Sequence, residues 1–470
     1  MKYQQEIHAY LQAKKKEIVT LLKNLIKIPS VRSEREENAP FGEKCAQILK
    51  TIRGLYQENG FQTEIDEKGG YLLSYYGESE KTLGLFAHAD VVSAGEDWIY
   101  ARPFEPIEKE GVLIGRGALD DKSAVVCSLY ILKLINDLSL PLDRKIVCFT
   151  GINEETGMCD IENYKDKHLP PEFSLVLDTA FPLYRGNKGV LRCSVKAKTK
   201  LKDILYLQGG DSANVTLGKT EGILPYDKEL YSWLKERETK RIKIEVEDEK
   251  IVLTAIGISK HGALPEGSLN AGWLLADLLK DCPFICEEDR NQMRVLSIVL
   301  ADIYGEKIGI ATEDAEFGKL TCSNGIVKTE DGKISFTLDI RFGEKDSVSQ
   351  LENTLTATFE KMDYEVEFLL GRNAHIIAED NPYVQTCMDV YKEFTGDTLA
   401  QTRINAGGTY AMRLPCAVEI GTTTIWGSLK DMPNGHGGVH QPDECISIEG
   451  FLEAIELTAL MVLACDKVEE

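Results

Sequence analysis

The chain has 470 residues, 43% of them hydrophobic, and carries a formal net charge of -22. A chain of this length exceeds one hydrophobic core, so we expect two domains. The excess of acidic residues repels phosphate backbones and anionic lipid headgroups, which argues against binding of nucleic acid or of a membrane surface through bulk charge.

The first segment predicts a surface helix. Apolar residues from Ile7 to Leu25 recur at helical spacing, and the pattern stops at Pro29. This segment has no uninterrupted apolar core of the signal-peptide type, and no other stretch approaches the length of a membrane span. We therefore expect a soluble, cytoplasmic protein. The 12 cysteines form no paired framework, which indicates reduced core thiols, although Cys282 and Cys286 in "CPFIC" offer a weak alternative as metal ligands.

Strand-like and helical runs alternate from about residue 70 to residue 180. Strands are predicted at 81–90, 145–151 and 173–178, with a helix at 123–138. Alternation of this kind favours parallel βαβ units and an α/β sheet.

The middle third has a different pattern. Its strands, at 241–258 and 332–342, are joined by short polar turns, and a helix at 268–281 accompanies them. These features are typical of an antiparallel sheet with packed helices. After about residue 377 the first pattern returns, ending in a long amphipathic helix. We therefore predict an α/β domain of residues 1–186 and 377–470, with mostly parallel strands, interrupted by an inserted α+β domain of residues 187–376.

Acidic and imidazole side chains follow several of the predicted strands. The carboxyl ends of strands in an α/β sheet gather functional groups at one edge. Each acid alone could be a structural cap, but crowded carboxylates repel one another unless protons or cations neutralise them. A mixed imidazole and carboxylate shell suits zinc, cobalt or manganese. The residues concerned are His88, Asp90, Asp120, Asp121, Glu154, Glu155 and Asp178.

A second imidazole is expected from elsewhere in the chain. His261 in "ISKHGALPEGS", and His436 and His440 in "PNGHGGVHQPDE", lie in loops of unusual composition. We interpret the remaining histidines outside the predicted strand ends as solvated or structural: His8, His168 and His375.

The order of these motifs resembles the co-catalytic dinuclear metallopeptidases, a group that includes glutamate carboxypeptidases, aminoacylases and bacterial dipeptidases of the PepV type. H-x-D is followed by "GRGALDDK", "NEE", "LD" and "HQPDE", and the resemblance runs from "LIKIPSV" at 25–31 to residues 440–444. The length, the large middle segment and "AGGTYAMRL" are more similar to the PepV-type dipeptidases than to the shorter aminoacylases. The resemblance implies a zinc-exopeptidase-like catalytic domain and an inserted lid or dimerisation domain.

The resemblance also implies a pair of divalent metal ions, zinc by expectation, with manganese or cobalt as alternatives. Asp120 would bridge the ions. His88 and Asp178 would complete one site, and Glu155 and His440 the other, with "HQPDE" favouring His440 over His436.

Two further acids take catalytic roles by the same resemblance. Glu154 would be the general base that takes a proton from a water bridging the two metals. Asp90 would accept the ring N–H of His88 and fix its tautomer, because residues i and i+2 of a strand point the same way. The family's bond between the two aspartates of "DD" is typically cis, which the sequence alone does not show.

The remaining assignments concern the substrate. His261 would stabilise the oxyanion and Arg341 would hold the terminal carboxylate, although a capping histidine and a surface ion pair are the structural alternatives. Asn214 matches a lid asparagine, but the usual N-x-V-P is replaced here by "NVTL". Gly407, Gly408 and Thr409 match a loop that approaches the substrate backbone, with Ala406 in place of a first glycine.

The function predicted is hydrolysis of dipeptides. Hydrolysis of N-acyl amino acids or carbamoyl compounds at the same site is the first alternative, and a non-catalytic scaffold is the second. The expected partner is a dipeptide or another small amide, without nucleic acid or membrane. Both a monomer and a homodimer remain open.

Overall fold

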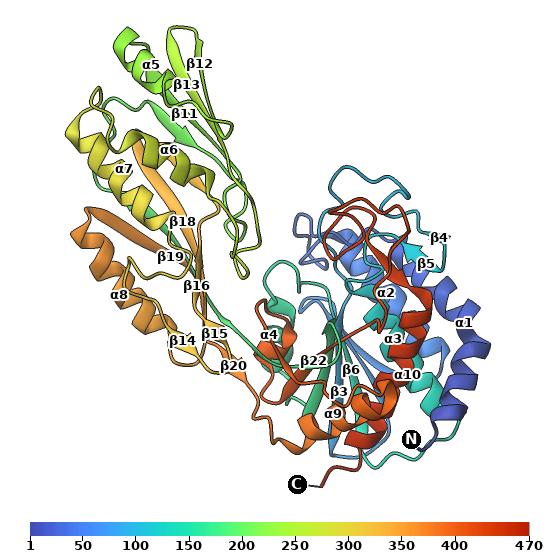
Figure 1. The fold of residues 1–470 in the computed structure, drawn as a ribbon. Coiled ribbons are helices and arrows are strands. Elements are labelled where there is room, and N and C mark those ends of the chain that lie inside the picture. The colour runs from blue at the N-terminus through green and yellow to red at the C-terminus, as the bar shows by residue number, and fades with distance from the viewer. Residues whose placement is uncertain (470) are drawn as a thin grey trace. The chain divides into compact units, whose positions relative to one another are not determined.

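The computed structural model describes residues 1–469. The chain divides into two compact units, and the second is inserted into the first (Figure 1). Unit 1 comprises Met1–Gly186 and Ile376–Glu470, and unit 2 comprises Asn187–His375.

Unit 1 is built on a mixed nine-stranded sheet with the order β1-β2-β6-β3-β7-β22-β8-β20, in which β21 pairs with β8. The central strands β6, β3, β7 and β22 run parallel, whereas β1 and β2 are antiparallel. The strands are β1 (Gln62–Asp66), β2 (Tyr71–Tyr76), β3 (Thr82–His88), β6 (Lys145–Gly151), β7 (Phe173–Thr179), β8 (Tyr184–Asn187), β20 (His375–Ile376), β21 (Arg403–Asn405) and β22 (Ala417–Gly421).

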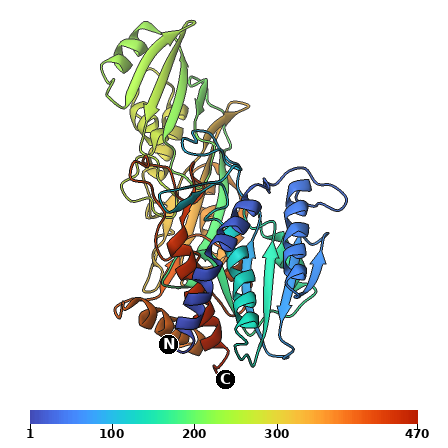
Figure 2. The same cartoon turned by 90° about the vertical axis from the view of Figure 1, so that its right-hand side faces the viewer.

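Alternate residues of the central strands enter two separate cores. Leu85 and Cys148 face the larger core, whereas their neighbours Phe86 and Phe149 face the smaller one. The larger core lies under α1 (Gln4–Ile26), α2 (Glu43–Glu58), α3 (Lys122–Asp137), α9 (Pro382–Thr395) and α10 (Ile448–Cys465). The smaller core lies under α4 (Cys159–Lys165) and the 3₁₀ helix η1 (Tyr410–Arg413). Helices α1 and α10, far apart in the sequence, pack side by side (Figure 2).

Local signals fix the ends of the late helices. The side chain of Asn381 accepts from Tyr383 N at the start of α9, Pro382 occupies the first turn, and Gly396 ends the helix at φ 74°. These are the residue types that each position favours. Ser447 caps α10 in the same way, accepting from Gly450 N.

A small three-stranded sheet with the order β23-β5-β4 joins two distant segments of unit 1. It is formed by β4 (Ile107–Lys109), β5 (Val112–Ile114) and β23 (Cys445–Ser447), and Cys445 lies opposite Ile114. The segment that follows His440 is thereby held alongside the segment that leads to Asp120.

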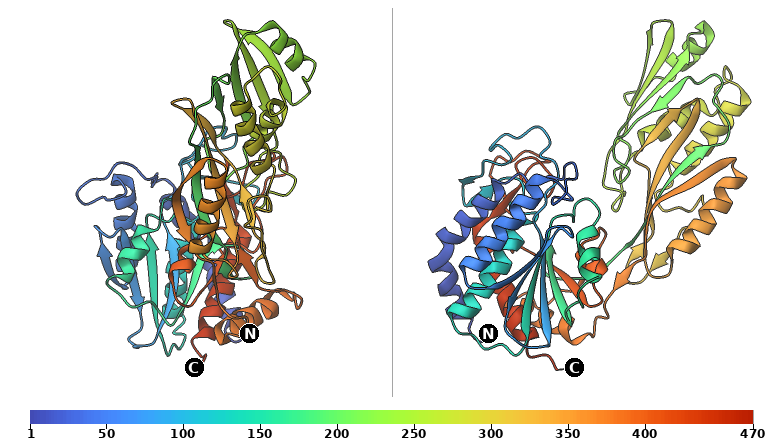
Figure 3. Two further views of the ribbon diagram at one scale, coloured as in Figure 1. Left: turned by 90° about the vertical axis from the view of Figure 1, so that its left-hand side faces the viewer. Right: turned by 180° about the vertical axis from the view of Figure 1, so that it is seen from behind.

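Unit 2 contains antiparallel sheets (Figure 3). Its buried hydrophobic residues form one main core. One sheet has the order β10-β11-β13-β12 and the other β16-β18-β9-β19, with β17 on β18 and a separate β14-β15 pair. The strands are β9 (Gly189–Ala197), β10 (Tyr206–Gln208), β11 (Lys219–Pro225), β12 (Ile242–Glu247), β13 (Lys250–Ile256), β14 (Glu313–Asp314), β15 (Gly318–Lys319), β16 (Thr321–Ser323), β17 (Val327–Glu330), β18 (Lys333–Phe342) and β19 (Tyr364–Arg372). The helices are α5 (Lys228–Lys235), α6 (Ala271–Leu279), α7 (Glu287–Val299) and α8 (Val348–Lys361).

The predicted fold class is confirmed: an α/β unit with parallel central strands carries an inserted unit of antiparallel sheets. All 12 cysteines are free thiols, and most are buried. Within residues 1–469, none of the helices combines the length and apolar character needed to cross a membrane.

Candidate metal centre and active site

The predicted ligands of unit 1 meet at one edge of its sheet. His88 is the last residue of β3, Asp178 lies near the end of β7, and Glu154 and Glu155 follow β6. Because β3, β6 and β7 are parallel neighbours, their carboxyl ends share that edge. Asp120 joins them from the loop before α3.

The two oxygens of Asp120 face different imidazoles. Oδ1 lies 3.0 Å from Nε2 of His88, and Oδ2 lies 3.1 Å from Nε2 of His440. A second carboxylate accompanies each imidazole: Asp178 Oδ1 lies 3.6 Å from Nε2 of His88, and Glu155 Oε2 lies 3.1 Å from Nε2 of His440. The cluster therefore has two halves that share one carboxylate, which is a suitable arrangement for two neighbouring cations. The peptide bond between Asp120 and Asp121 is cis.

The hydrogen bonding of His88 indicates which of its ring nitrogens can bind a metal ion. Its Nδ1 lies 2.9 Å from the main-chain oxygen of Asp90. A carbonyl oxygen only accepts, so in the neutral ring Nδ1 carries the proton and Nε2 presents a lone pair. Nε2 and Oδ1 of Asp120 are buried, and neither has hydrogen-bond geometry to a partner. Two such atoms facing each other can share a proton or a metal ion, and an imidazole nitrogen beside carboxylate oxygens is a donor set that fits a divalent metal.

Potential metal-donor atoms also lie close together in two overlapping sets, neither of which contains His440. Atoms of His88, Asp120 and Glu155 lie within 4.8 Å of one another, and so do atoms of His88, Glu154 and Asp178. Glu154 therefore stands beside the ligand cluster, close enough to act on a group bound there.

Burial and crowding raise the pKa values of three carboxylates in the cluster. Burial and the nearby Asp178 raise the pKa of Glu154 well above its usual range. Burial and Asp120 raise the pKa of Glu155 to about 7, although its hydrogen bond to His440 opposes this. Burial also raises the pKa of Asp178. Such a site holds its negative charge only when protons or cations compensate for it.

The pKa values of the two imidazoles are raised, and the pKa of Asp120 is lowered. Burial lowers the pKa of His440, but hydrogen bonds to Asp120 and Glu155 outweigh it and raise the pKa to about 10. For His88, burial is likewise outweighed by Asp178 and Asp120, and the pKa lies well above its usual range. Burial raises the pKa of Asp120, but the nearby imidazoles of His440 and His88 lower it overall. Protons and metal ions therefore compete for the same imidazole nitrogens.

His436 has a different environment from His440. Its Nδ1 lies 2.8 Å from Oδ2 of Asp443, and Asp443 also accepts from the main-chain N of Ile99 and Tyr100. His436 therefore belongs to a hydrogen-bonded loop anchor, whereas His440 faces the carboxylate cluster.

Asp90 is placed differently from the sequence expectation in one respect. Nδ1 of His88 is nearer to the Asp90 main-chain oxygen, at 2.9 Å, than to its carboxylate, at 3.4 Å. The two carboxylate oxygens instead accept from the main-chain N of Glu154 and of Glu155, each at 3.2 Å. Asp90 thus orients the turn that carries both glutamates.

Two buried aspartates near this edge have partners that the sequence did not predict. Asp121 accepts from the main-chain N of His88 at 3.2 Å. Asp160 accepts from the main-chain N of Asn153 at 2.7 Å and from the hydroxyl of Tyr410 at 2.6 Å. The "DD" pair was a signal for Asp121, but Asp160 stands in an ordinary helical run that gives no signal.

The predicted loop of Gly407, Gly408 and Thr409 lies in unit 1 and is linked to the hydrogen bonds of Asp160 through Tyr410. Thr409 Oγ1 donates to Glu419 Oε1 at 2.5 Å, and Gly407 N donates to Asn405 Oδ1 at 2.8 Å. A Cβ on Gly408 would lie 2.4 Å from the sulfur of Met412, so a side chain there would displace the methionine. Tyr410, next in sequence, connects this loop through Asp160 to the segment before Glu154.

The predicted substrate residues of unit 2 form a second group. Gly262 N, next to His261, donates to the main-chain oxygen of Asn214 at 2.7 Å. The oxygen of Gly262 accepts from Thr321 Oγ1 at 3.2 Å, and Thr321 lies opposite Arg341 in the β16–β18 pair. Unit 2 therefore brings Asn214, His261 and Arg341 into one region. The His261 side chain is exposed, whereas Arg341 is buried and donates through Nε to Asp339 at 2.7 Å.

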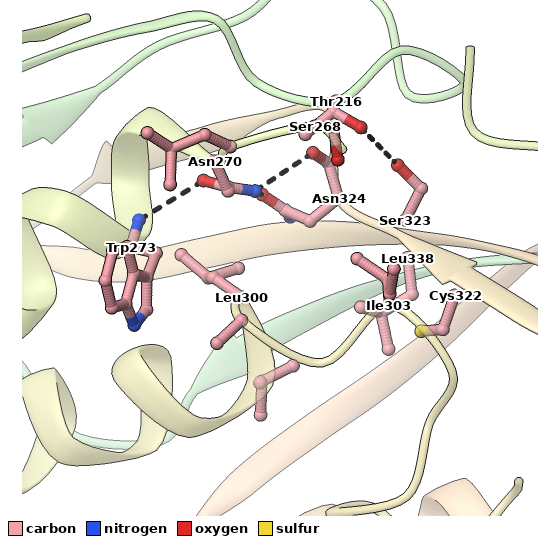
Figure 4. Close-up of a pocket in the computed structure, with 13 residues that line it drawn as sticks. Thr216, Ser268, Asn270, Trp273, Leu300, Ile303, Cys322, Ser323, Asn324 and Leu338 are labelled. Carbon is pink, nitrogen blue, oxygen red and sulfur yellow. Dashed lines mark hydrogen bonds between the residues drawn. The ribbon is translucent and has the colours of Figure 1, made fainter. Parts of the chain in front are cut away.

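A cavity of about 210 Å³ in unit 2 is lined by residues that include Thr216, Asn270 and Ser323 (Figure 4). Its polar side chains bond to one another: Asn270 Nδ2 donates to Asn324 Oδ1 at 3.1 Å, and the hydroxyls of Thr216 and Ser323 are 3.3 Å apart. Thr216 N also donates to the main-chain oxygen of Lys260 at 2.8 Å. These contacts hold together the segments that carry Asn214 and His261.

A third group of possible donors, Asp203, Cys286 and Asp289, also lies in unit 2. Asp289 accepts from the main-chain N of Lys202, Asp203 and Ile204, and Asp203 accepts from Cys286 N. Main-chain donors thus account for these carboxylates, and the group has the character of a loop anchor.

The strand ends of this α/β unit carry a donor set of imidazoles and carboxylates, with a further glutamate beside it. Such a site suits metal-assisted attack of water. The fold and the site therefore define the class of metal-dependent hydrolases. The chain belongs to Peptidase family M20/M25/M40, whose sequence model matches residues 84–464. It is therefore a hydrolase of a metal-dependent peptidase family, and the predicted resemblance is confirmed at the family level.

Similar proteins agree with this membership. The Bacillus subtilis protein named "Putative dipeptidase YtjP" is 28% identical over 466 residues, which cover 95% of this chain and 96% of that protein. Human carnosine dipeptidase 1 matches with a TM-score of 0.60 at 15% identity over 100% of both chains. The dipeptidase Dug1p of Saccharomyces cerevisiae matches with a TM-score of 0.60 at 14% identity over 99% of both chains. The two solved structures are similar to this chain in fold.

Proposed function

We propose that this protein is a dipeptidase with two divalent metal ions, zinc by preference. The observation that carries the proposal is that the two oxygens of Asp120 face two imidazoles, and that one of these contacts lacks hydrogen-bond geometry on both sides. The proposed ligands are His88, Asp120 and Asp178 for one ion, and His440, Asp120 and Glu155 for the other.

The bound ions would supply a lowered pKa for water and polarisation of the amide carbonyl. Glu154 takes the proton from the attacking water and delivers it to the leaving amine. It must be ionised to do so, and positive charge at the ligand cluster lowers the pKa that burial and neighbouring acids raise. Asp90 holds the main chain of Glu154 and so orients its carboxylate.

We assign substrate recognition to His261, Asn214 and Arg341 of unit 2, and to the loop of Gly407, Gly408 and Thr409 in unit 1. We assign donation to the oxyanion to the exposed imidazole of His261, whose Nδ1 accepts from the main-chain N of Ala263 at 3.3 Å. Arg341 is oriented by Asp339 and has the planar fork that suits a substrate carboxylate. The name of the Bacillus subtilis relative supports a dipeptide as the substrate.

A substrate panel tests this proposal. Protein loaded separately with zinc, manganese or cobalt is assayed on leucylglycine, leucylglycylglycine and N-acetylleucine, with Glu154→Gln as the inactive reference. We expect the dipeptide to be cleaved fastest. Faster cleavage of N-acetylleucine would instead establish an aminoacylase, and equal rates on the dipeptide and the tripeptide would contradict restriction to dipeptides. Absence of hydrolysis with every metal would contradict the proposal as a whole.

A further inference from the structure

Two charged residues of the sequence motifs remain without a role: Arg116 in "GRGALDDK" and Glu444 in "HQPDE". Both are buried, with exposed fractions of 1% and 0%. Arg116 NH1 donates to Glu444 Oε2 at 2.6 Å, which joins two loops that are far apart in the sequence. A buried ion pair stabilises a fold only weakly in general, so its position needs another explanation.

The second oxygen of Glu444 holds the loop that carries Asp120. Oε1 accepts from the main-chain N of Gly117 at 3.0 Å, of Leu119 at 2.9 Å and of Asp120 at 3.0 Å. Gly117 has a φ of 86°, a conformation that favours glycine, so this loop follows a tight path. Glu444 thus fixes the main chain at Asp120 itself.

Arg116 holds the segment that carries His440. Its NH2 donates to the main-chain oxygens of His440 at 3.3 Å and of Ala94 at 3.2 Å. His440 has a φ of 61°, which a residue with a side chain rarely adopts unless its surroundings impose it. The guanidinium also lies over the ring of Trp98, 5.5 Å from its centre.

We propose that Arg116 and Glu444 form a buried clamp that positions Asp120 and His440 relative to each other and thereby sets the affinity of the site for a divalent metal. The small sheet of β5 and β23 brings the two halves of the clamp together, because β5 directly precedes Gly115 and β23 directly follows Glu444. The clamp rests on the proposed function in that it takes Asp120 and His440 as metal ligands. Arg116 and Glu444 are positioning residues, since they act through those ligands.

The test is the zinc affinity of Glu444→Gln. Glutamine keeps the shape of glutamate, but its amide N–H₂ must face either Arg116 or the main-chain donors of the loop, so at least one contact is lost. Zinc affinity is measured by competition with a chelating indicator, using metal-stripped full-length protein. We expect affinity to fall about 10- to 100-fold, the range found when hydrogen-bond partners of metal ligands are removed. The visible spectrum of the cobalt-loaded protein should also change.

Glu456→Gln is the matched control. Glu456 is a buried carboxylate of α10 in the same unit and bonds to Nδ1 of His8 at 2.8 Å. Its replacement should leave zinc affinity and the cobalt spectrum unchanged, even if it lowers the unfolding temperature. Unchanged affinity and spectrum in Glu444→Gln would overturn the clamp and leave a purely structural ion pair.

A second variant covers the case in which Glu444→Gln does not fold. Glu444→Asp keeps the charge but shortens the reach, so it should also weaken zinc binding, and wild-type affinity in this variant would overturn the clamp. Failure of the wild-type protein to bind zinc, manganese or cobalt would be a different result, because it contradicts the metal site of the proposed function itself.

Discussion

Nε2 of His88 and Oδ1 of Asp120 lie 3.0 Å apart, buried, without forming a hydrogen bond. In the neutral imidazole the proton lies on Nδ1, which faces the main-chain oxygen of Asp90. In the neutral ring a lone pair therefore faces a carboxylate oxygen, and this contact becomes favourable when a metal ion or a proton lies between the two atoms. The proposed metal centre rests on this relationship.

Metal binding should stabilise the folded protein. At a free zinc concentration about 100 times the dissociation constant, binding adds about 2.7 kcal/mol to the free energy of unfolding. Thermal unfolding of stripped protein with and without zinc measures this effect. The same experiment on His88→Ala should give a much smaller shift. An equal shift in both proteins would place the binding elsewhere.

Replacement of His88 and of Asp90 should have different effects. His88→Ala removes a proposed ligand, so the metal content should fall. Asp90→Ala removes the acceptor that orients the turn of Glu154 and Glu155, so turnover should fall while much of the metal remains. Metal analysis and dipeptide hydrolysis measured on the same preparations check this. Equal loss of metal in both variants would refute the orienting role of Asp90.

Replacement of Glu154 should separate metal binding from turnover. Glu154→Gln keeps the size of the side chain but removes the base, so kcat should fall by about 10²- to 10⁴-fold. The metal content should stay at the wild-type value. Glu172→Gln is a suitable control, because Glu172 precedes β7 at the opposite edge of the sheet and pairs with Arg144. A Glu154 variant that retains wild-type kcat would require another base.

The stability of the metal-free protein should fall as pH rises. The pKa of Glu155 is raised to about 7 and that of His440 to about 10 in the folded protein. Both shifts favour the protonated form, so their stabilisation is complete below the unfolded pKa values and is lost as pH rises through the folded ones. The effect of His440 is moderated by its solvent exposure.

Unfolding temperatures of stripped protein at about pH 6 and about pH 9 measure this dependence. The stabilisation by zinc should show the opposite trend and grow with pH, because the metal needs both groups deprotonated. His440→Gln should reduce both trends. A stripped protein that is equally stable at both pH values would contradict the proposed coupling.

Loss of the unit 2 imidazole should reduce catalysis with little effect on folding. His261 is exposed, so His261→Ala should leave the unfolding temperature near that of the wild type. If His261 donates to the oxyanion, kcat should fall by about 10²- to 10³-fold. His8→Ala, which removes another exposed imidazole, is the control. A His261 variant with normal kcat would indicate the capping role that the sequence also allowed.

Strand direction was sufficient to predict that several of the proposed ligands share one edge of the sheet, whereas the roles of Asp120 and His440, which lie in loops, came from the family resemblance. His88, Glu155 and Asp178 each follow or end a hydrophobic run, and parallel neighbours place such ends together. The insertion of one domain into the other was predicted because the sequence pattern changes from that of parallel strands to that of antiparallel strands and then back again. Both inferences depend on local periodicity and need no knowledge of side-chain partners.

The residues that the sequence did not explain are those whose partners are main-chain groups of distant loops. Glu444 and Asp160 look like ordinary acids, and only the folded chain shows which N–H groups they accept. The carboxylate of Asp90 was expected to face His88 by strand alternation. The strand β3 ends at His88, however, so alternation no longer fixes the direction of Asp90.

The most direct test of the metal centre is the zinc-to-protein ratio of wild-type and His88→Ala protein after equilibration with zinc and removal of unbound metal. The proposed site predicts two zinc ions per chain in the wild type and fewer in the variant. A wild-type protein without bound zinc, or a His88→Ala protein with the same zinc content as the wild type, would contradict it.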